Sequence, residues 1–301
     1  LLAGRVWIDP LAPETRNASV ILMQLRLPRA VLALVLGAGL GASGAAMQGF
    51  LRNPLADPGL FGIAPGAALG AVLSFWTGYA ASTYLLPVFA LVGAGGAMAL
   101  LALIAGREGG VALFTLAGLM ISSLAGALMS LAISLSPTPF AMSEIVTWLM
   151  GTLADRSWRE VWIATPFTLA GIGVLIAAGR SLDALTLGEA AARSLGVDPR
   201  RLQALMIAGI GLTVGAGVAV AGIIGFVGLV VPHLVRPLTD RRPSSLIVPS
   251  ALAGALLLLI ADCLCRILPL AGGELRLGIA LSLLGAPFFL HLLLKMRRGL
   301  A

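Results

Sequence analysis

Charged residues are scarce in this sequence. Only 11% of its 301 residues are Asp, Glu, Lys or Arg, whereas 59% are hydrophobic, and the mean hydropathy is +1.02. A soluble domain of this length needs a charged surface, so the composition indicates an integral membrane protein instead. The 20 basic residues include a single lysine, Lys295, and they lie scattered at the ends of apolar runs. That scatter argues against nucleic-acid binding and fits anchoring at lipid headgroups.

Side chains that commonly carry chemistry are also rare. The two cysteines, Cys263 and Cys265, stand in one apolar run, and His233 and His291 are far apart, so no metal-ligand spacing is present. The phosphate-binding pattern G-x-x-x-x-G-K-[ST] does not occur, which excludes nucleotide hydrolysis by this chain. We therefore predict no catalytic residues, no metal site and no cofactor. For His233 a packing role is favoured over an iron or haem ligand, because a lone imidazole is weak evidence.

Long uncharged runs are abundant, and they predict an all-α protein that crosses the membrane many times. The predicted spans are 30–51, two within 58–106, one within 109–143, 161–179, two within 202–235, 243–261 and 277–294, nine in all. Glycines and Pro232 interrupt the end of 202–235, which predicts a full span followed by a shorter, broken one. Residues 1–10 look like the tail of another apolar helix, so we expect one further span before them.

The two halves of the chain, 1–160 and 161–301, share a pattern. A Gly-rich span, "LGAGLGASGAAMQG", precedes a proline-marked break at 54–65, and "AGIGLTVGAGVAVAGIIG" precedes a break at "VVPHLVRP". Small residues at this spacing let helix backbones approach closely. With five spans in each half, the second half would enter the membrane from the opposite side. The pattern therefore predicts an inverted repeat within one transmembrane domain, 1–301.

The basic residues set the expected orientation. If "KMRRG" near the C-terminus is cytoplasmic and the spans alternate, 12 of the 20 basic residues lie inside. This is the direction of the positive-inside rule. Three arginines then face the outside, against the rule, so their position requires a separate explanation. They are Arg26, Arg29 and Arg266.

Two polar segments fall on the cytoplasmic side in this topology. The first, "RNPLADPGLFGIAPG" at 52–66, predicts a rigid non-helical turn at the mouth of a span, where it can narrow a pore. The second, 180–201, predicts two short helices joined by a turn outside the bilayer. Within it Glu189 and Arg193 stand four residues apart, a spacing that supports a short helix.

Four stretches together resemble the FecCD-type permeases of ABC importers, which carry iron–siderophores, haem or cobalamin into bacteria. They are "RLPRAVLALVLGAGLGASGAAMQGFLRNPLADPGLFGI", "GEAAARSLGVDPRR", "GFVGLVVPHLVR" and "ELRLGIALSLLGAPFFLHLLLK". The resemblance implies a ten-helix type II importer permease in the bacterial inner membrane, with nine helices visible here. It also implies a second permease copy, two cytoplasmic ATP-binding subunits and a periplasmic substrate-binding protein.

The resemblance also implies roles for particular residues. Those matching the cytoplasmic gate are Asn53, Leu55, Gly110, Val111 and Ala112. Those matching the ATPase-coupling segment are Gly188, Glu189, Ala190, Ala191, Arg193 and Gly196. Those matching the docking site of the binding protein are Arg26, Arg29 and Arg266. The gate departs from cobalamin permeases, which have small hydroxylated residues where this sequence has Gly110, Val111 and Ala112. An apolar gate would close by dewetting.

Import of iron chelates, as siderophores or haem, is the substrate prediction, on the likeness of "MSEIVTWLMGTLADRSW" to iron-type members. A cobalamin importer is the first alternative. An ion-coupled secondary transporter is the second, but such carriers bury ionisable residues near mid-membrane. Here nearly all charges stand at span ends, apart from Asp262 and Arg266, which are spaced to pair with each other.

Overall fold

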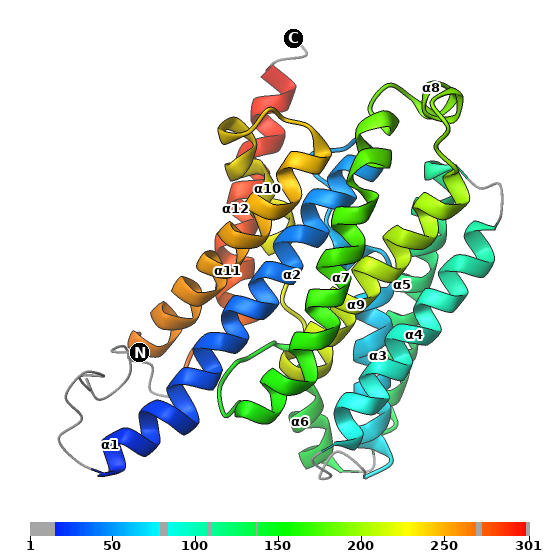
Figure 1. Cartoon of the computed structure of the whole chain (residues 1–301). Coiled ribbons are helices and arrows are strands. Elements are labelled where there is room, and N and C mark those ends of the chain that lie inside the picture. The colour runs from blue at the N-terminus through cyan, green and yellow to red at the C-terminus, as the bar shows by residue number, and fades with distance from the viewer. Residues whose placement is uncertain (1–15, 79–83, 107–109, 137, 269–272, 299–301) are drawn as a thin grey trace.

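The computed structural model describes residues 16–78, 84–106, 110–136, 138–268 and 273–298, and within these ranges the chain is helical without strands (Figure 1). The expected helix tail at 1–10 lies outside the described residues. The elements in order are α1 (Arg16–Val20), a π-helical segment (Ile21–Arg26), α2 (Leu27–Leu51), a 3-10 turn (Pro58–Leu60), α3 (Ile63–Trp76), α4 (Leu85–Ala105), α5 (Val111–Ser134), α6 (Pro139–Leu149), α7 (Trp158–Leu185), α8 (Glu189–Ser194), α9 (Pro199–Ala221), α10 (Val227–Val235), a second 3-10 turn (Arg236–Leu238), α11 (Pro243–Ile267) and α12 (Leu277–Arg298).

Seven helical stretches of the described chain are long and apolar enough to cross a membrane: Ala18–Leu51, which contains α2, and α4, α5, α7, α9, α11 and α12. The other two predicted spans correspond to apolar but shorter helices, α3 and Val227–Leu238. The sequence predicted that the helix at Val227–Leu238 would be short, and this is confirmed. It did not predict that α3 would be short. The sequence did not predict α6, which begins at Pro139. Thr138 caps this helix, because its hydroxyl accepts a hydrogen bond from the Ala141 N–H at 3.1 Å.

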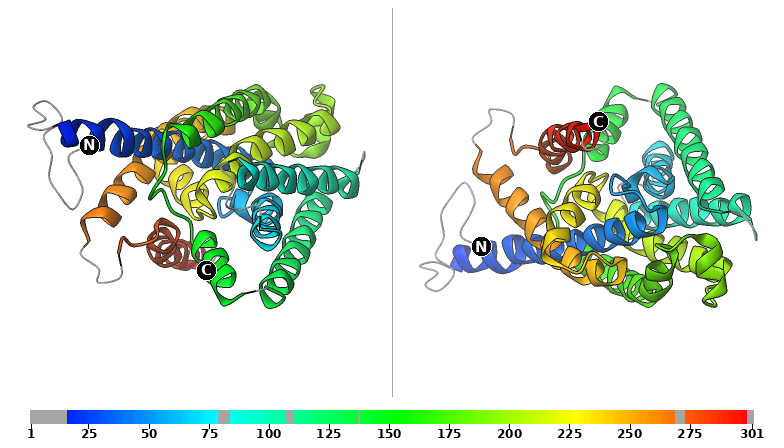
Figure 2. Two further views of the ribbon diagram at one scale, coloured as in Figure 1. Left: turned by 90° about the horizontal axis from the view of Figure 1, so that it is seen from below. Right: turned by 90° about the horizontal axis from the view of Figure 1, so that it is seen from above.

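Helix α2 runs through the middle of the bundle and contacts α7, α9, α10 and, most extensively, α11 (Figure 2). The predicted close approach of Gly-rich helices is confirmed along it. A Cβ built on Gly41 would lie 2.0 Å from the backbone oxygen of Ser250 on α11, and one on Gly44 would lie 2.0 Å from the backbone oxygen of Gly228 on α10. These glycines are required because the backbones themselves are in contact.

Each short helix follows a residue in the left-handed backbone region. Gly62 precedes α3 with a φ of 82°, and Phe226 precedes α10 with a φ of 67°. A non-helical segment therefore separates α2 from α3, and another separates α9 from α10. The long helices α2 and α9 run in opposite directions along the bundle (Figure 1). A phenylalanine is strained in this conformation, so the surrounding structure must hold it there.

The segment 180–201 differs from the prediction of two short helices. Its first residues continue α7 to Leu185, because Leu182 and Leu185 are buried against the bundle. Only α8 is a separate short helix, bounded by Gly188 and Gly196 with φ of 102° and 85°, values that favour glycine. Asp198 then caps α9 by accepting a hydrogen bond from the Arg200 N–H at 2.9 Å.

Figure 1 places α8 and the C-terminal end of α12 at one end of the bundle, and α1 at the other. This arrangement agrees with the orientation deduced from the basic residues, in which α8 is cytoplasmic. The ends of α2 and α5 that carry the predicted gate residues lie on the side of α8.

We predict that Gly41→Ala destabilises the protein by roughly 1–3 kcal/mol, because the new methyl group overlaps the backbone of α11. Gly173→Ala on α7 is the matched control, since a Cβ there meets nothing within 4 Å. It should leave stability unchanged or raise it by up to about 1 kcal/mol, from helix propensity. Unfolding of the purified protein in detergent measures both. Equal effects at the two positions would contradict the backbone contact.

Candidate cytoplasmic gate and coupling site

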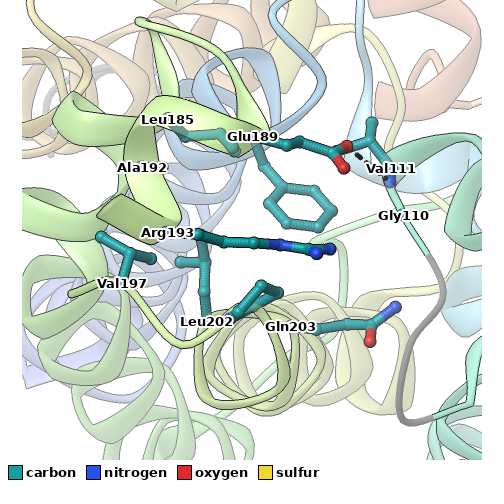
Figure 3. Close-up of a pocket in the computed structure, with 11 residues that line it drawn as sticks. Gly110, Val111, Leu185, Glu189, Ala192, Arg193, Val197, Leu202 and Gln203 are labelled. Atoms are coloured by element: carbon teal, nitrogen blue, oxygen red, sulfur yellow. Dashed lines mark hydrogen bonds between the residues drawn. The ribbon is translucent and has the colours of Figure 1, made fainter. Parts of the chain in front are cut away.

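A cleft lies beneath α8, at the end of the bundle that the basic residues predict to be cytoplasmic (Figure 3). Its lining residues come from α2, α5, α7, α8 and α9 and are Phe50, Gly110, Val111, Leu185, Glu189, Ala192, Arg193, Val197, Pro199, Leu202 and Gln203. Figure 3 shows Glu189 reaching from α8 towards Val111, while Arg193 extends into the cleft from the same helix. The structure therefore brings predicted coupling residues next to a predicted gate segment, although the two lie almost 80 positions apart.

Among the described residues, one hydrogen bond joins α8 to this predicted gate segment. The backbone N–H of Val111 donates to Oε1 of Glu189 at 3.2 Å. Val111 is the first residue of α5, so its N–H has no acceptor within the helix, and a carboxylate is favourable at this positive end. Among the described ion pairs none joins Glu189 to Arg193. The prediction that Glu189 and Arg193 stabilise α8 as a pair is therefore wrong, because the Glu189 carboxylate is directed to α5.

An aromatic cluster connects this gate segment to the other one. Phe114, one turn after Val111, is buried, and its ring centroid lies 5.0 Å from that of Phe50 and 5.7 Å from that of Phe61. Phe50 precedes the turn that contains Asn53, and Phe61 follows it. Aromatic pairs at these separations attract each other by about 0.5–1.5 kcal/mol. The two predicted gate segments are thus packed against one another through Phe114.

The turn itself is held by local hydrogen bonds. Oδ1 of Asn53 accepts from the N–H of Leu55 at 2.9 Å, which closes an Asx turn. The carboxylate of Asp57 accepts from the N–H of Gly59 at 2.7 Å. Pro58 packs against Gly228, where a Cβ would lie only 2.7 Å from Cδ of Pro58, so the break that follows α2 is in close contact with the first turn of α10. Asp57 belongs to the turn predicted at 52–66, and its place before Pro58 is typical of a cap.

The three predicted docking arginines lie near one another at the end of the bundle opposite α8. Arg29 donates to Asp262 at 2.8 Å and lies 2.8 Å from a carboxylate oxygen of Glu274. Arg266 donates to the other oxygen of Asp262 at 2.9 Å, which confirms the expected pair within α11. All three arginines, Arg26 included, have little exposure. The structure therefore places them together but directs Arg29 and Arg266 to partners within the chain.

His233 and Cys265 both make packing contacts within the bundle. The His233 ring packs edge-on against Phe288 of α12, with centroids 5.7 Å apart, and Cys265 is buried in α11. These contacts favour the packing role for both side chains over a ligand role.

Seven apolar spans among the described residues, and two long helices that each end in a break before a short helix, are the architecture of a membrane transport subunit. The family model of the FecCD transport family matches residues 2–295, and the chain belongs to this family of ABC importer permeases. As such it is a multi-pass protein of the bacterial inner membrane that works with ATP-binding subunits and a substrate-binding protein. This membership corrects the alternative of an ion-coupled carrier.

Curated relatives and a solved structure agree with this assignment. The vitamin B12 import system permease protein BtuC of Escherichia coli O9:H4 (strain HS) is 39% identical over 304 residues, covering 99% of this chain and 91% of BtuC. An uncharacterised ABC transporter permease protein, YvrB of Bacillus subtilis (strain 168), is 40% identical over 285 residues, covering 93% and 80%. A solved inward-facing structure of a metal-chelate type ABC transporter matches with a TM-score of 0.87 and 34% identity, covering 95% and 91%.

We predict that Asp262→Asn destabilises the protein by about 3–5 kcal/mol, because it leaves two buried guanidinium groups without their shared carboxylate. The control is Asp240→Asn, which removes a carboxylate paired with Arg242 at the surface and should change nothing measurable. Thermal unfolding in detergent gives the comparison. A neutral Asp262→Asn would show that the cluster does not hold α2 to α11.

Proposed function

We propose that the chain is the permease subunit of an ATP-driven importer for a large metal chelate, either an iron chelate (a siderophore complex or haem) or cobalamin. The observation that carries the proposal is the hydrogen bond from Val111 to Glu189, because it links the coupling helix to a gate segment. The sequence favours iron chelates. Cobalamin has equal support, since the relative BtuC is named for vitamin B12 import.

The proposed transmission runs through three contacts. Movement of the ATP-binding subunit displaces α8, and Glu189 passes the displacement to the start of α5. Phe114 then moves with α5 and presses on Phe50 and Phe61, which flank the turn containing Asn53 and Leu55. A displacement at the contact between Glu189 and Val111 therefore moves both parts of the proposed gate. These parts are Asn53 with Leu55, and residues 110–112. Val111 and Ala112 present apolar groups, so closure acts by excluding water.

The proposed assembly contains two permease copies and two ATP-binding subunits. Support comes from α5 and α12, which expose more large apolar side chains than α2 or α9, and α5 lies at the edge of the bundle (Figure 2). A second copy covering these helices would place the pathway beside both gate segments. Lipid would cover the apolar surface that remains.

We also propose the ten-helix inverted repeat. In each half a long, deeply buried helix, α2 or α9, ends in a break and is followed by a short helix, α3 or α10, that begins after a left-handed residue. The two long helices run in opposite directions (Figure 1). The proposed repeat pairs α2 with α9 and α3 with α10.

Docking of the binding protein at Arg26, Arg29 and Arg266 stays a prediction. Their common location at the end opposite α8 supports it. Because Asp262 and Glu274 already hold Arg29, an acidic group of the binding protein would have to compete with these internal carboxylates. Docking would then loosen the contact between α2 and α11.

Glu189 variants test the transmission. In the assembled importer, Glu189→Ala should lower substrate transported per ATP hydrolysed by roughly tenfold, the effect of losing one hydrogen bond to a charged group. Glu189→Gln keeps a side-chain oxygen for the Val111 N–H and should retain most of the coupling. If instead both variants fail equally, the charge of Glu189 serves the ATP-binding subunit and not α5.

Substrate class is tested with proteoliposomes containing the importer and its binding protein. We expect ATP-dependent uptake of a ferric siderophore, haem or cobalamin, and no uptake by the permease without its ATP-binding subunits. The ligand retained by the purified binding protein identifies which of the three is carried. Accumulation driven by an ion gradient alone would refute the proposal.

A further inference from the structure

A second cavity opens at the cytoplasmic end, beside the turn that follows α2 and separate from the cleft under α8. Its volume is about 190 Å³, which exceeds the space of a single water molecule several-fold. It lies where the end of α2, the end of α7 and the connection from α10 to α11 meet. The lining residues are Gln48, Gly49, Arg52, Asn53, Pro54, Thr186, Arg236, Arg241, Pro243 and Leu246.

The lining contains three arginines and no acidic residue. In the described part of the chain, none of Arg52, Arg236 and Arg241 forms an ion pair, whereas the neighbouring Arg242 pairs with Asp240. Arg241 is close enough to Arg236 for their charges to repel. Like charges gathered around one cavity are unfavourable unless an anion lies between them.

Arg236 is held in place by the interior. Its Nη2 donates to Oε1 of Gln48 at 2.6 Å, and the amide nitrogen of Gln48, itself buried, lies within hydrogen-bond distance of the carbonyl oxygens of Gly228 and Leu229. The Nε of Arg236 is buried and has no acceptor among the described groups. This donor is open to an acceptor from outside the chain, either a water molecule or an oxygen-bearing ligand.

The backbone conformations of the other two arginines, Arg52 and Arg241, also support a ligand site in this cavity. Arg52 ends α2 with a φ of 50°, and Arg241 has a φ of 65°. The Asn53 N–H donates to the Gln48 carbonyl at 3.1 Å, so Arg52 occupies a helix-ending position that normally favours glycine. Arginine at two such strained positions is consistent with a function of the side chains.

We propose that this cavity binds a phosphate-type oxyanion. Guanidinium groups suit phosphate because they are always charged and donate paired hydrogen bonds to its oxygens. The ligand would be either a free phosphate or the phosphate of an anionic lipid headgroup, since the cavity lies at the ends of membrane-spanning helices on the predicted cytoplasmic side. Bound there, it would join the turn containing Asn53 to the start of α11. The proposal does not depend on which substrate the importer carries.

The test uses the complete importer with its ATP-binding subunits, in detergent. Thermal unfolding is followed against increasing sodium phosphate, with chloride replacing it at equal ionic strength. Arg52→Gln with Arg241→Gln should raise the half-saturating phosphate concentration at least tenfold, the expected loss for charged hydrogen bonds. The matched control is Arg180→Gln with Arg242→Gln, which removes two exposed cytoplasmic charges outside the cavity. Phosphate sites of the ATP-binding subunits are common to all variants.

Two further measurements complete the design. Native mass spectrometry after incubation with phosphatidylglycerol counts retained lipid, which should fall tenfold in the cavity variant if the headgroup is the ligand. Arg52→Gly with Arg241→Gly relieves the strained backbone, so this variant should be at least as stable as the parent in chloride yet lose the phosphate response. Undiminished stability in chloride together with a lost phosphate response would show that the variant has lost its ligand and not its fold.

The outcomes discriminate between the sources. A phosphate response that disappears only in the cavity variants supports a free phosphate, and loss of lipid retention in the same variants supports a headgroup. Equal behaviour of cavity and control variants in both measurements refutes the proposal. Weaker assembly with the ATP-binding subunits and an unchanged anion response would also refute it, because an acidic segment of that subunit would then fill the cavity.

Discussion

The arrangement of the bundle depends on the close approach of α2 to α10 and α11. Burial of apolar surface does not by itself bring helices together in a membrane, because lipid chains are as apolar as leucine side chains. Dense packing of backbone on backbone must supply the attraction, and Gly37, Gly41 and Gly44 provide it on one face of α2. With the middle of α2 fixed in this way, both of its ends acquire defined positions. One end carries the turn with Asn53, and the other carries Arg29.

The two ends are held with unequal strength. At the end opposite α8, Arg29 and Arg266 share Asp262 in a buried cluster, and removal of one member would leave charge without a partner. At the end near α8, the described residues attach α5 to α8 by one hydrogen bond and to the turn by aromatic contacts, each worth about 1 kcal/mol. Rearrangement is therefore easier at the end near α8, where the sequence predicts the gate.

The sequence predicts the spans well and the contacts between distant segments poorly. Uncharged runs locate the helices because the bilayer excludes charge over a fixed thickness, and glycine spacing predicts the packing of α2. The boundary of α7 was missed because Leu182 and Leu185 find their partners only in the folded bundle. Likewise, Arg29 and Asp262 are 233 positions apart, and the local spacing within α11 predicts only the pair with Arg266. Spacing cannot specify contacts that depend on how helices cross.

The same limit explains why Glu189 was assigned to the wrong neighbour. On an isolated helix, a partner four residues away is the nearest opposite charge, and an exposed pair of this kind contributes only about 0.3–0.5 kcal/mol. The unpaired N–H at the start of α5 competes successfully, since capping a helix with a carboxylate is worth about 1 kcal/mol. The stronger local interaction therefore draws the carboxylate across the cleft, away from Arg193. That choice leaves the guanidinium of Arg193 extending into the cleft beneath α8, where an ATP-binding subunit can meet it.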